Sequence, residues 1–316
     1  MKYSPYPLFA FTLGLFAICE MSLAQSRSGS PASRPVSLTV TVTNDRKEVV
    51  SGLPQNAFTI SDDIGVREIA SFSNEDVPVS IIILIDLSGS VKSDRRTQKK
   101  AKFISDALAQ FVHKSNPSNE YFIIGFNTTP YLLLDGTRDA IAALSTLQKL
   151  ASEELKGNTA LYDACLAGIE KAARSIYRKQ VILLISDGGE NSSQYKLSDV
   201  RRLLKEKNVL LYAVNITMGS NGERIDDWHT GPQVLEEFAS LTGGAMLSPN
   251  NPADMKAILE RIALELRQQY SISFLPTKDV SSGKWHPLKI KVSLPVGNSQ
   301  GIQKLTGRSR KGYYPA

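Results

Sequence analysis

The chain has 316 residues, of which 42% are apolar and 22% charged, a composition typical of globular proteins and not of disordered or fibrous chains. The net charge of +6 is uneven: residues 270–316 hold eight Lys or Arg against one acidic residue, Asp279, so this segment carries +7 and the rest about −1. No aromatic stripe accompanies these charges, so we expect no nucleic-acid partner. We interpret the cations first as lysines on exposed strand faces and edges, where they discourage aggregation. An anionic surface or polymer is the alternative partner.

Residues 1–24 have the features of a signal peptide. Lys2 provides a positive start, the apolar run after it is short for a membrane span, and small residues stand at Ser22 and Ala24, as signal cleavage prefers. We therefore expect cleavage after Ala24, an exported protein that is periplasmic or secreted, and no transmembrane segment in the mature chain; an uncleaved anchor is the alternative. The mature chain keeps one cysteine, Cys165, and can form no intramolecular disulfide; we expect its thiol to be buried against the core.

A polar linker rich in Ser covers residues 25–34, and an N-terminal β segment covers residues 35–76. In this segment apolar and polar residues alternate, as in strands with one buried face. The predicted strands are 37–46, 57–63 and 66–73, the last two joined by a turn at 62–65.

From Val77 the apolar runs no longer alternate with polar residues, which is typical of strands covered by helices on both faces. Along residues 77–267 such strands alternate with stretches whose apolar residues recur at helical spacing. This alternation predicts βαβ crossovers and a parallel sheet. The predicted strands are 77–86, 121–127, 131–136, 180–188, 209–216 and 245–248. The predicted helices are 95–114, 137–150, 160–177, 197–207, 233–241 and 252–267.

The basic C-terminal segment, residues 268–316, returns to β character, with predicted strands at 270–276, 286–294 and 310–315. Because β segments flank one α/β block, we expect the two ends of the chain to pack together. The predicted fold class is thus α/β, with a Rossmann-like, doubly wound, mainly parallel sheet and a small accessory β module built from the N- and C-terminal segments.

Polar side chains follow the predicted buried strands at their carboxyl ends, where open parallel sheets bind ligands. Asp86 and Asp187 lie at the ends of two such strands, and Ser88 and Ser90 follow the first. Thr159 lies directly before a predicted helix. Carboxylates and hydroxyls are hard oxygen donors, so the sequence predicts a Mg²⁺ site, with Mn²⁺ or Ca²⁺ as alternative ions. A cation held by neutral hydroxyls would keep coordination positions that a carboxylate from another molecule could occupy.

The motifs "DLSGS", "GNTALYDA" and "LISDGG", in this order, resemble the von Willebrand factor type A domain. The resemblance covers roughly residues 77–267 and implies a metal-ion-dependent adhesion site. It implies the ligands Asp86, Ser88, Ser90, Thr159 and Asp187, and a protein partner that presents an Asp or Glu side chain. The flanking "GLPQNAFTISDD" and "RSRKGYY" are similar to a group of exported bacterial von Willebrand A-related proteins, best known from acidobacteria.

Enzymatic motifs are missing from the sequence. "DLSGS" lacks the first glycine of a G-x-S-x-G elbow, no phosphate-binding loop occurs, and no general base accompanies the predicted metal ligands. We interpret Glu190 and Asn191 as solvated loop residues, with a position at the border of the ligand site as the alternative. The sequence therefore predicts a non-enzymatic binding module. The alternatives are an envelope protein that binds anionic polymer through its basic β module, and a metal-dependent hydrolase.

Overall fold

The computed structural model describes most of the chain after the predicted signal peptide. The described residues are 34–89, 95–150, 156–217, 231–251, 253–276, 283–294 and 304–315. The signal peptide, most of the linker and Ser90 lie outside them. In the described ranges, no helix is both long enough and apolar enough to cross a membrane.

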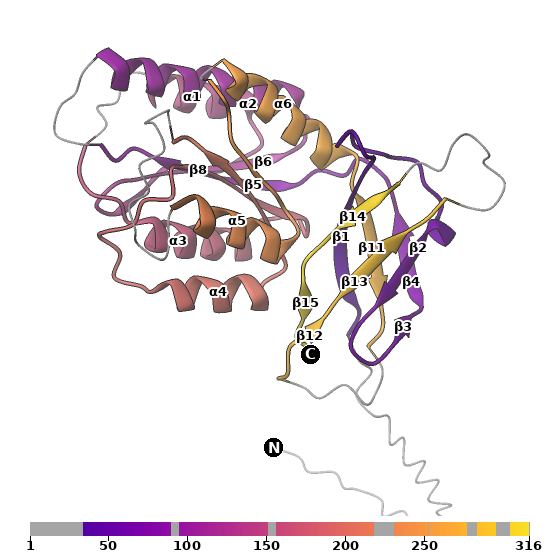
Figure 1. Ribbon diagram of the computed structural model, residues 1–316. Helices are drawn as coiled ribbons and strands as arrows, with labels where there is room; N and C mark the ends of the chain where they lie inside the picture. Colours follow the sequence, from indigo (N-terminus) through magenta and orange to yellow (C-terminus); the bar gives the residue numbers. More distant parts are fainter. Residues whose placement is uncertain are drawn as a thin grey trace, which may run out of the picture. The chain divides into compact units, whose positions relative to one another are not determined.

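A six-stranded sheet forms the centre of the α/β block (Figure 1). Its strands are β5 (Ser80–Asp86), β6 (Glu120–Phe126), β7 (Pro130–Thr137), β8 (Gln180–Ser186), β9 (Val209–Asn215) and β10 (Met246–Leu247). Their order in the sheet is β10-β9-β8-β5-β6-β7, and only the β6–β7 pair is antiparallel. This arrangement confirms the predicted doubly wound, mainly parallel sheet.

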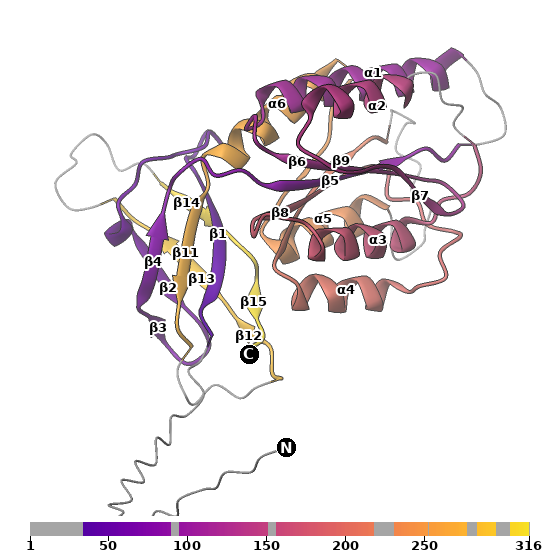
Figure 2. The same ribbon diagram turned by 180° about the vertical axis from the view of Figure 1, so that it is seen from behind.

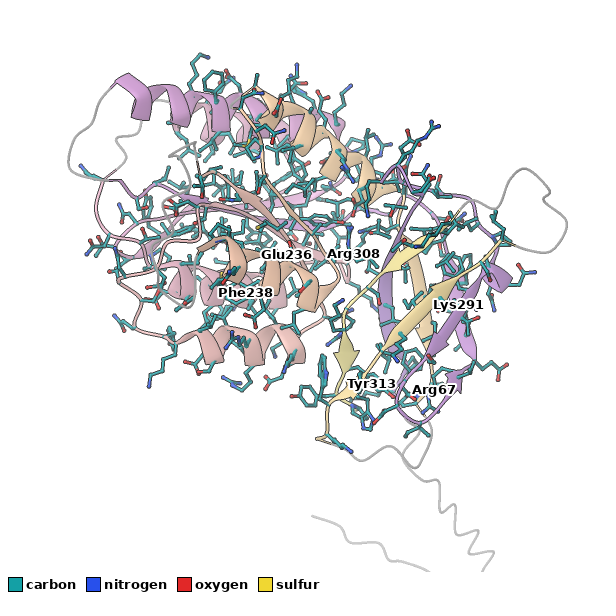
Figure 3. The ribbon with its side chains drawn as sticks, in the orientation of Figure 1. Arg67, Glu236, Phe238, Lys291, Arg308 and Tyr313 are labelled. Carbon is teal, nitrogen blue, oxygen red and sulfur yellow. The ribbon has the colours of Figure 1, made fainter. Side chains whose placement is uncertain are left out.

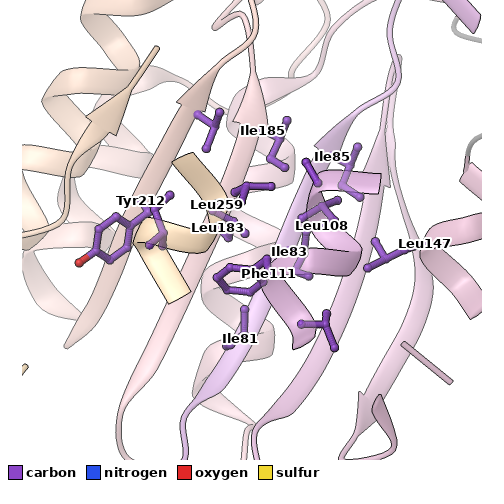
Figure 4. Packing of buried hydrophobic residues seen from close by; sticks show 14 of the residues in the cluster. Ile81, Ile83, Ile85, Leu108, Phe111, Leu147, Leu183, Ile185, Tyr212 and Leu259 are labelled. Carbon is purple, nitrogen blue, oxygen red and sulfur yellow. The ribbon is translucent and has the colours of Figure 1, made fainter. Parts of the chain in front are cut away.

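Helices cover both faces of this sheet (Figures 1 and 2). One face carries α1 (Arg95–Lys114), α2 (Ala140–Leu150) and α6 (Asp254–Arg267), and the other carries α3 (Leu161–Ala173), α4 (Leu197–Glu206) and α5 (Gly231–Thr242). Successive residues of a strand point to opposite faces, so Ile81 and Ile83 enter the core under α1, whereas Ile82 and Leu84 enter the core over α3. Figure 4 shows the first of these cores. The unbroken apolar run in β5 follows from this double coverage.

The strand order of the sheet reverses between β5 and β8. From β5 it crosses through α1 to β6 on one side, and from β8 it crosses through α4 to β9 on the other. The carboxyl ends of β5 and β8 therefore border the crevice in which open α/β sheets bind ligands.

The accessory β module contains strands from both ends of the chain. One antiparallel sheet has the order β14-β1-β11-β4, and a second has the order β13-β2-β3. The strands are β1 (Val36–Thr43), β2 (Phe58–Ser61), β3 (Val66–Arg67), β4 (Ile69–Ser73), β11 (Tyr270–Phe274), β13 (Lys289–Val292) and β14 (Thr306–Arg308), with a separate pair of β12 (His286–Pro287) and β15 (Gly312–Tyr313) and one 3₁₀ turn, Gln55–Ala57. Strand β14 was not predicted, because three residues "TGR" carry no alternation and gain strand geometry only by pairing with β1.

The basic residues of the C-terminal segment have two different environments. Lys289 and Lys291 are exposed on β13, as expected of charges that protect a sheet (Figure 3). Arg308 instead forms a salt bridge with the buried carboxylate of Glu265 in α6, and Arg310 donates to the carbonyl oxygen of Lys205 (2.5 Å). For these two arginines the expectation of simple surface charge is wrong, because the tail folds back onto helices of the α/β block.

Glu265 is the centre of a buried polar network. Its side chain is 4% exposed, and it accepts hydrogen bonds from Tyr212 of β9, from Thr41 of β1 (3.2 Å) and from Arg308 of β14. Burial opposes the charge of Arg308, but Tyr212 and Glu265 outweigh that effect and raise the pKa of the guanidinium. Residues 33–316 form one compact unit. Within this unit, the network around Glu265 connects the α/β block to the accessory β module through polar contacts.

We predict that Arg308→Met lowers the free energy of unfolding by about 3 kcal/mol, because Glu265 is left buried without its cation. Urea denaturation measures the change. The double variant Arg308→Met/Glu265→Gln should be destabilised by clearly less than the sum of the two single variants, since no unpaired charge remains.

The control is Lys102→Met, which breaks the exposed Lys102–Asp106 pair in α1. It should change the free energy of unfolding by about 0.5 kcal/mol or less. Strictly additive effects of the two network substitutions would contradict the assignment of Arg308 as the cation that compensates Glu265.

Candidate functional site

Asp86, the last residue of β5, is a buried carboxylate with neutral hydrogen-bond donors. Its side chain accepts from the amide and hydroxyl of Ser88 (3.0 and 2.5 Å) and from the hydroxyl of Ser186 (2.6 Å). The residue is 4% exposed. Burial raises the pKa of Asp86, and the charge of Asp187 raises it further, although the three hydrogen bonds oppose this shift. In the described part of the chain, no cation donates to this carboxylate.

Ser186 was not among the predicted site residues, although it holds one oxygen of Asp86. It ends β8, and the parallel register, which pairs Ile85 with Ile185, brings it level with Asp86. The hydroxyl of Ser186 also accepts the amide of Gly188 (2.9 Å) and so fixes the start of the next loop. The sequence offered a signal for Ser186, since it directly precedes Asp187 in "LISDGG". Its hydrogen bond to Asp86, however, depends on the register between β5 and β8.

Asp187 begins a tightly turned loop. Gly188 has φ +81°, and a side chain there would meet the backbone oxygen of Gly231 at 2.2 Å, so glycine is required for both the turn and the close approach. The amide of Gly189 donates to one carboxylate oxygen of Asp187 (2.9 Å). A methyl group placed on Gly189 would lie 3.1 Å from that oxygen and 4.0 Å from the hydroxyl of Thr159. These two oxygens therefore face the same small space.

Thr159 is held in place from the Asp187 loop. Its amide donates to the side chain of Asn191 (2.8 Å), and its carbonyl oxygen accepts the amide of Asn191 (3.0 Å). Thr159 is 8% exposed. The two loops thus form one unit through reciprocal hydrogen bonds.

The Ser88 loop is joined to the same unit by backbone contacts. The amide of Lys156 donates to the carbonyl oxygen of Leu87 (3.1 Å), and the amide of Gly89 donates to that of Gly157 (3.4 Å). Asp86, Ser88, Thr159 and Asp187, distant in sequence, are thereby brought to one edge of the sheet. The fifth predicted ligand, Ser90, lies outside the described residues.

Glu190 and Asn191 are half-buried and exposed loop residues, as expected, but both also have structural roles. Glu190 accepts the amide of Tyr162 in the first turn of α3 (3.0 Å) and both the amide and hydroxyl of Ser193 (2.8 and 2.6 Å). This carboxylate satisfies amides at the helix N-terminus, where negative charge is favoured. Asn191 positions Thr159, so both residues support the site.

The assembled oxygens suit a hard divalent cation better than any softer metal. Ser88 contacts Asp86 directly, Asp187 and Thr159 both lie near Gly189, and the charge of Asp187 acts on Asp86. All four side chains supply oxygen, and none supplies a thiolate or an imidazole. Cys165 is buried in α3, and burial raises the pKa of its thiol. Among the described residues no group of three or more His, Cys, Asp or Glu could hold a metal. A cation here would therefore depend on hydroxyl ligands.

Comparison with known proteins matches part of the α/β block to a known domain family. Residues 81–190 match the model of the von Willebrand factor type A domain. A protein from Mycolicibacterium paratuberculosis, named only UPF0353 protein, is 25% identical over 206 residues, which span 59% of this chain and 60% of that relative. The chain thus spans less than two thirds of the curated relative that it matches.

Solved structures of similar proteins include BatB from Bacteroides thetaiotaomicron, at 22% identity and TM-score 0.40, which covers 59% of this chain and 98% of its own. Another is a von Willebrand factor type A protein from Catenulispora acidiphila, at 13% identity and TM-score 0.45, which covers 90% of this chain and 75% of its own.

The matched segment starts in β5, which ends at Asp86, and finishes in the loop after β8 that contains Asp187. It therefore includes Thr159 and the other predicted metal ligands. The chain contains a von Willebrand factor type A domain.

Proposed function

We propose that this protein is an exported, non-enzymatic binding module. Asp86, Ser88, Ser90, Thr159 and Asp187 would hold one divalent cation, Mg²⁺ or alternatively Mn²⁺ or Ca²⁺. The cation, when bound, would accept an Asp or Glu carboxylate from a protein partner. The observation that carries the proposal is the buried, uncompensated carboxylate of Asp86 beside a second carboxylate, Asp187.

The argument for a cation is electrostatic. An ionised carboxylate is costly to bury unless it is paired, and a second carboxylate nearby increases that cost. The donors to Asp86 are hydroxyls and an amide, which stabilise its charge only in part. A divalent ion would compensate both carboxylates at once, and oxygen ligands favour Mg²⁺, Mn²⁺ or Ca²⁺.

The argument for an external carboxylate rests on the ligand set and its exposure. Hydroxyls are neutral, so a cation bound by Ser88 and Thr159 keeps more of its positive charge than one enclosed by acids. Asp187 is half-buried and Gly189 is exposed, so this side of the site faces solvent. Mg²⁺ commonly retains water at such open positions, and a partner's carboxylate could replace one of them.

Two observations support a non-enzymatic role. Glu190, the nearest further acid in the Asp187 loop, is committed to amides of its own loop and of α3, so it is poorly suited to act as a base. The two histidines in the described ranges lie elsewhere: His113 is in the last turn of α1, and His286 of β12 is hydrogen-bonded to Asp63. Metal-assisted hydrolysis normally requires a base that prepares the water.

Binding of the ion should be visible as a thermal shift. We expect Mg²⁺, Mn²⁺ or Ca²⁺ to raise the unfolding midpoint relative to EDTA, since an ion at ~100 times its Kd stabilises the folded state by about 2.7 kcal/mol. Asp86→Asn should abolish this rise. In EDTA the same variant should be at least as stable as the wild type, because it removes a buried charge and its repulsion by Asp187.

The matched control is Asp135→Asn on β7, whose carboxylate is exposed and pairs with Lys171. This variant should keep the full metal-dependent rise. An equal rise in Asp86→Asn and the wild type would place any bound ion elsewhere and refute the proposed site.

The partner's chemistry can be tested with random peptides selected for binding in Mg²⁺ and released in EDTA. We expect the enriched peptides to contain an essential Asp or Glu. Its replacement by Asn or Gln should weaken binding about tenfold or more, as expected for loss of a charge-assisted contact. Peptides without acidic residues, or binding that persists in EDTA, would contradict carboxylate recognition.

A further inference from the structure

A cavity lies far from Asp86, at the amino ends of the strands of the central sheet. It has a volume of about 490 Å³, and its lining includes Gln180 and Val209, the first residues of β8 and β9. Asp86 and Asp187 stand at the carboxyl ends of the strands, so this cavity is separate from the candidate metal site. Its volume falls in the range of small-molecule pockets.

One wall of the cavity is a face of the β14-β1-β11-β4 sheet covered with hydroxyl groups. Ser37 of β1, Ser273 of β11 and Ser71 of β4 lie side by side in register, and the hydroxyls of Ser71 and Ser273 are 2.5 Å apart. Thr39 and Ser271 continue this pattern two residues along their strands. The residues between them, such as Leu38, Ile272 and Phe72, belong to the core of the β module.

In the half of β1 that borders the cavity and in β11, the outward positions are thus all Ser or Thr: Ser37, Thr39, Ser271 and Ser273. Short hydroxyls leave space and can both donate and accept hydrogen bonds. A face of this kind is suited to a ligand that is itself rich in hydroxyl groups.

The opposite wall carries positive charge. Arg178, Lys179 and Arg310 line the cavity, and none of its lining residues, all within the described ranges, is acidic. Lys179 donates to the carbonyl oxygen of Leu266 (2.6 Å) and Arg310 to that of Lys205 (2.5 Å). These carbonyl oxygens are neutral, so neither cation is matched by a carboxylate there.

The acids closest to Lys179 have other partners. Asp76 pairs with Arg267 (2.7 Å), and Glu265 pairs with Arg308. Both act on Lys179 only at longer range, and burial lowers the pKa of its ammonium to about 8. Burial likewise lowers the pKa of Arg310 to about 10. Arg310 also lies over the ring of Trp285, 5.9 Å from the ring centroid. None of these contacts supplies a full negative charge, so an anion in the cavity would stabilise both cations.

We propose that this cavity binds an acidic sugar of about monosaccharide size, with its carboxylate or phosphate group at Arg178, Lys179 and Arg310. The sugar hydroxyls would contact Ser37, Ser71 and Ser273 on the opposite wall. The ligand would therefore touch both the β module and the α/β block. This binding is independent of the divalent cation, so the proposal does not rest on the function proposed above.

The test is isothermal titration of the full chain in EDTA with glucuronate, glucose 6-phosphate, glucose and inorganic phosphate as probes. We expect at least one of the two acidic sugars to bind about tenfold or more tightly than glucose, because glucose lacks the charge-assisted contacts. Preference for glucuronate would identify a carboxylate ligand, and preference for glucose 6-phosphate a phosphate ligand. Inorganic phosphate that binds as tightly as the sugar phosphate would refute the role of the hydroxyl wall.

Two variants locate the site. Arg178→Gln changes an exposed side chain and should leave folding intact, and Lys179→Gln removes the half-buried charge. Each should weaken binding of the preferred acidic sugar about tenfold. Lys291→Gln, on the exposed face of β13 in the same module (Figure 3), is the matched control and should bind as the wild type does. Unchanged affinity in both cavity variants, or no acidic sugar that binds more tightly than glucose, would overturn the proposal.

Discussion

The parallel pairing of β5 with β8 is the constraint on which the candidate site depends. These strands are neighbours in the sheet although about a hundred residues separate them in the chain, and the crossovers leave them in opposite directions. Their carboxyl ends are thereby free of a covering connection. The same register brings Ser186 to Asp86, and the loop that follows β8 brings Asp187 and Asn191 to Thr159. A shift in this register would separate the carboxylates from their hydroxyl neighbours.

The support around the site is mostly backbone and neutral side chains. Loops that begin at Leu87, Lys156 and Asp187 exchange hydrogen bonds, and Glu190 is used to satisfy amides of α3. This arrangement holds the oxygens rigidly without supplying a cation of its own. Such preorganisation suits a binding site, since little ordering remains to be done when an ion or a partner arrives.

The β module is connected to the α/β block by polar groups as well as by the chain itself. Glu265 of α6 accepts hydrogen bonds from Thr41 and Arg308, which belong to strands from opposite ends of the chain, and from Tyr212 of β9. The module also presents a hydroxyl-covered face to the cavity that contains Lys179 and Arg310. The described residues therefore form two chemically distinct polar clusters, one rich in carboxylates at the carboxyl ends of the strands and one rich in cations at their amino ends.

The sequence by itself determined the fold class, since unbroken apolar runs such as residues 81–85 require cover on both faces, and it also indicated which strand ends carry polar residues. These features depend on local period and composition. Only the tertiary structure decided the roles of Ser186, Glu190, Arg308 and the short β14, because each depends on a partner that is remote in the chain. The alternation around Ser37 and Thr39 indicated an outward strand face, but not that a wall with positive charge lies opposite. That juxtaposition arises from long-range packing, which local patterns do not encode.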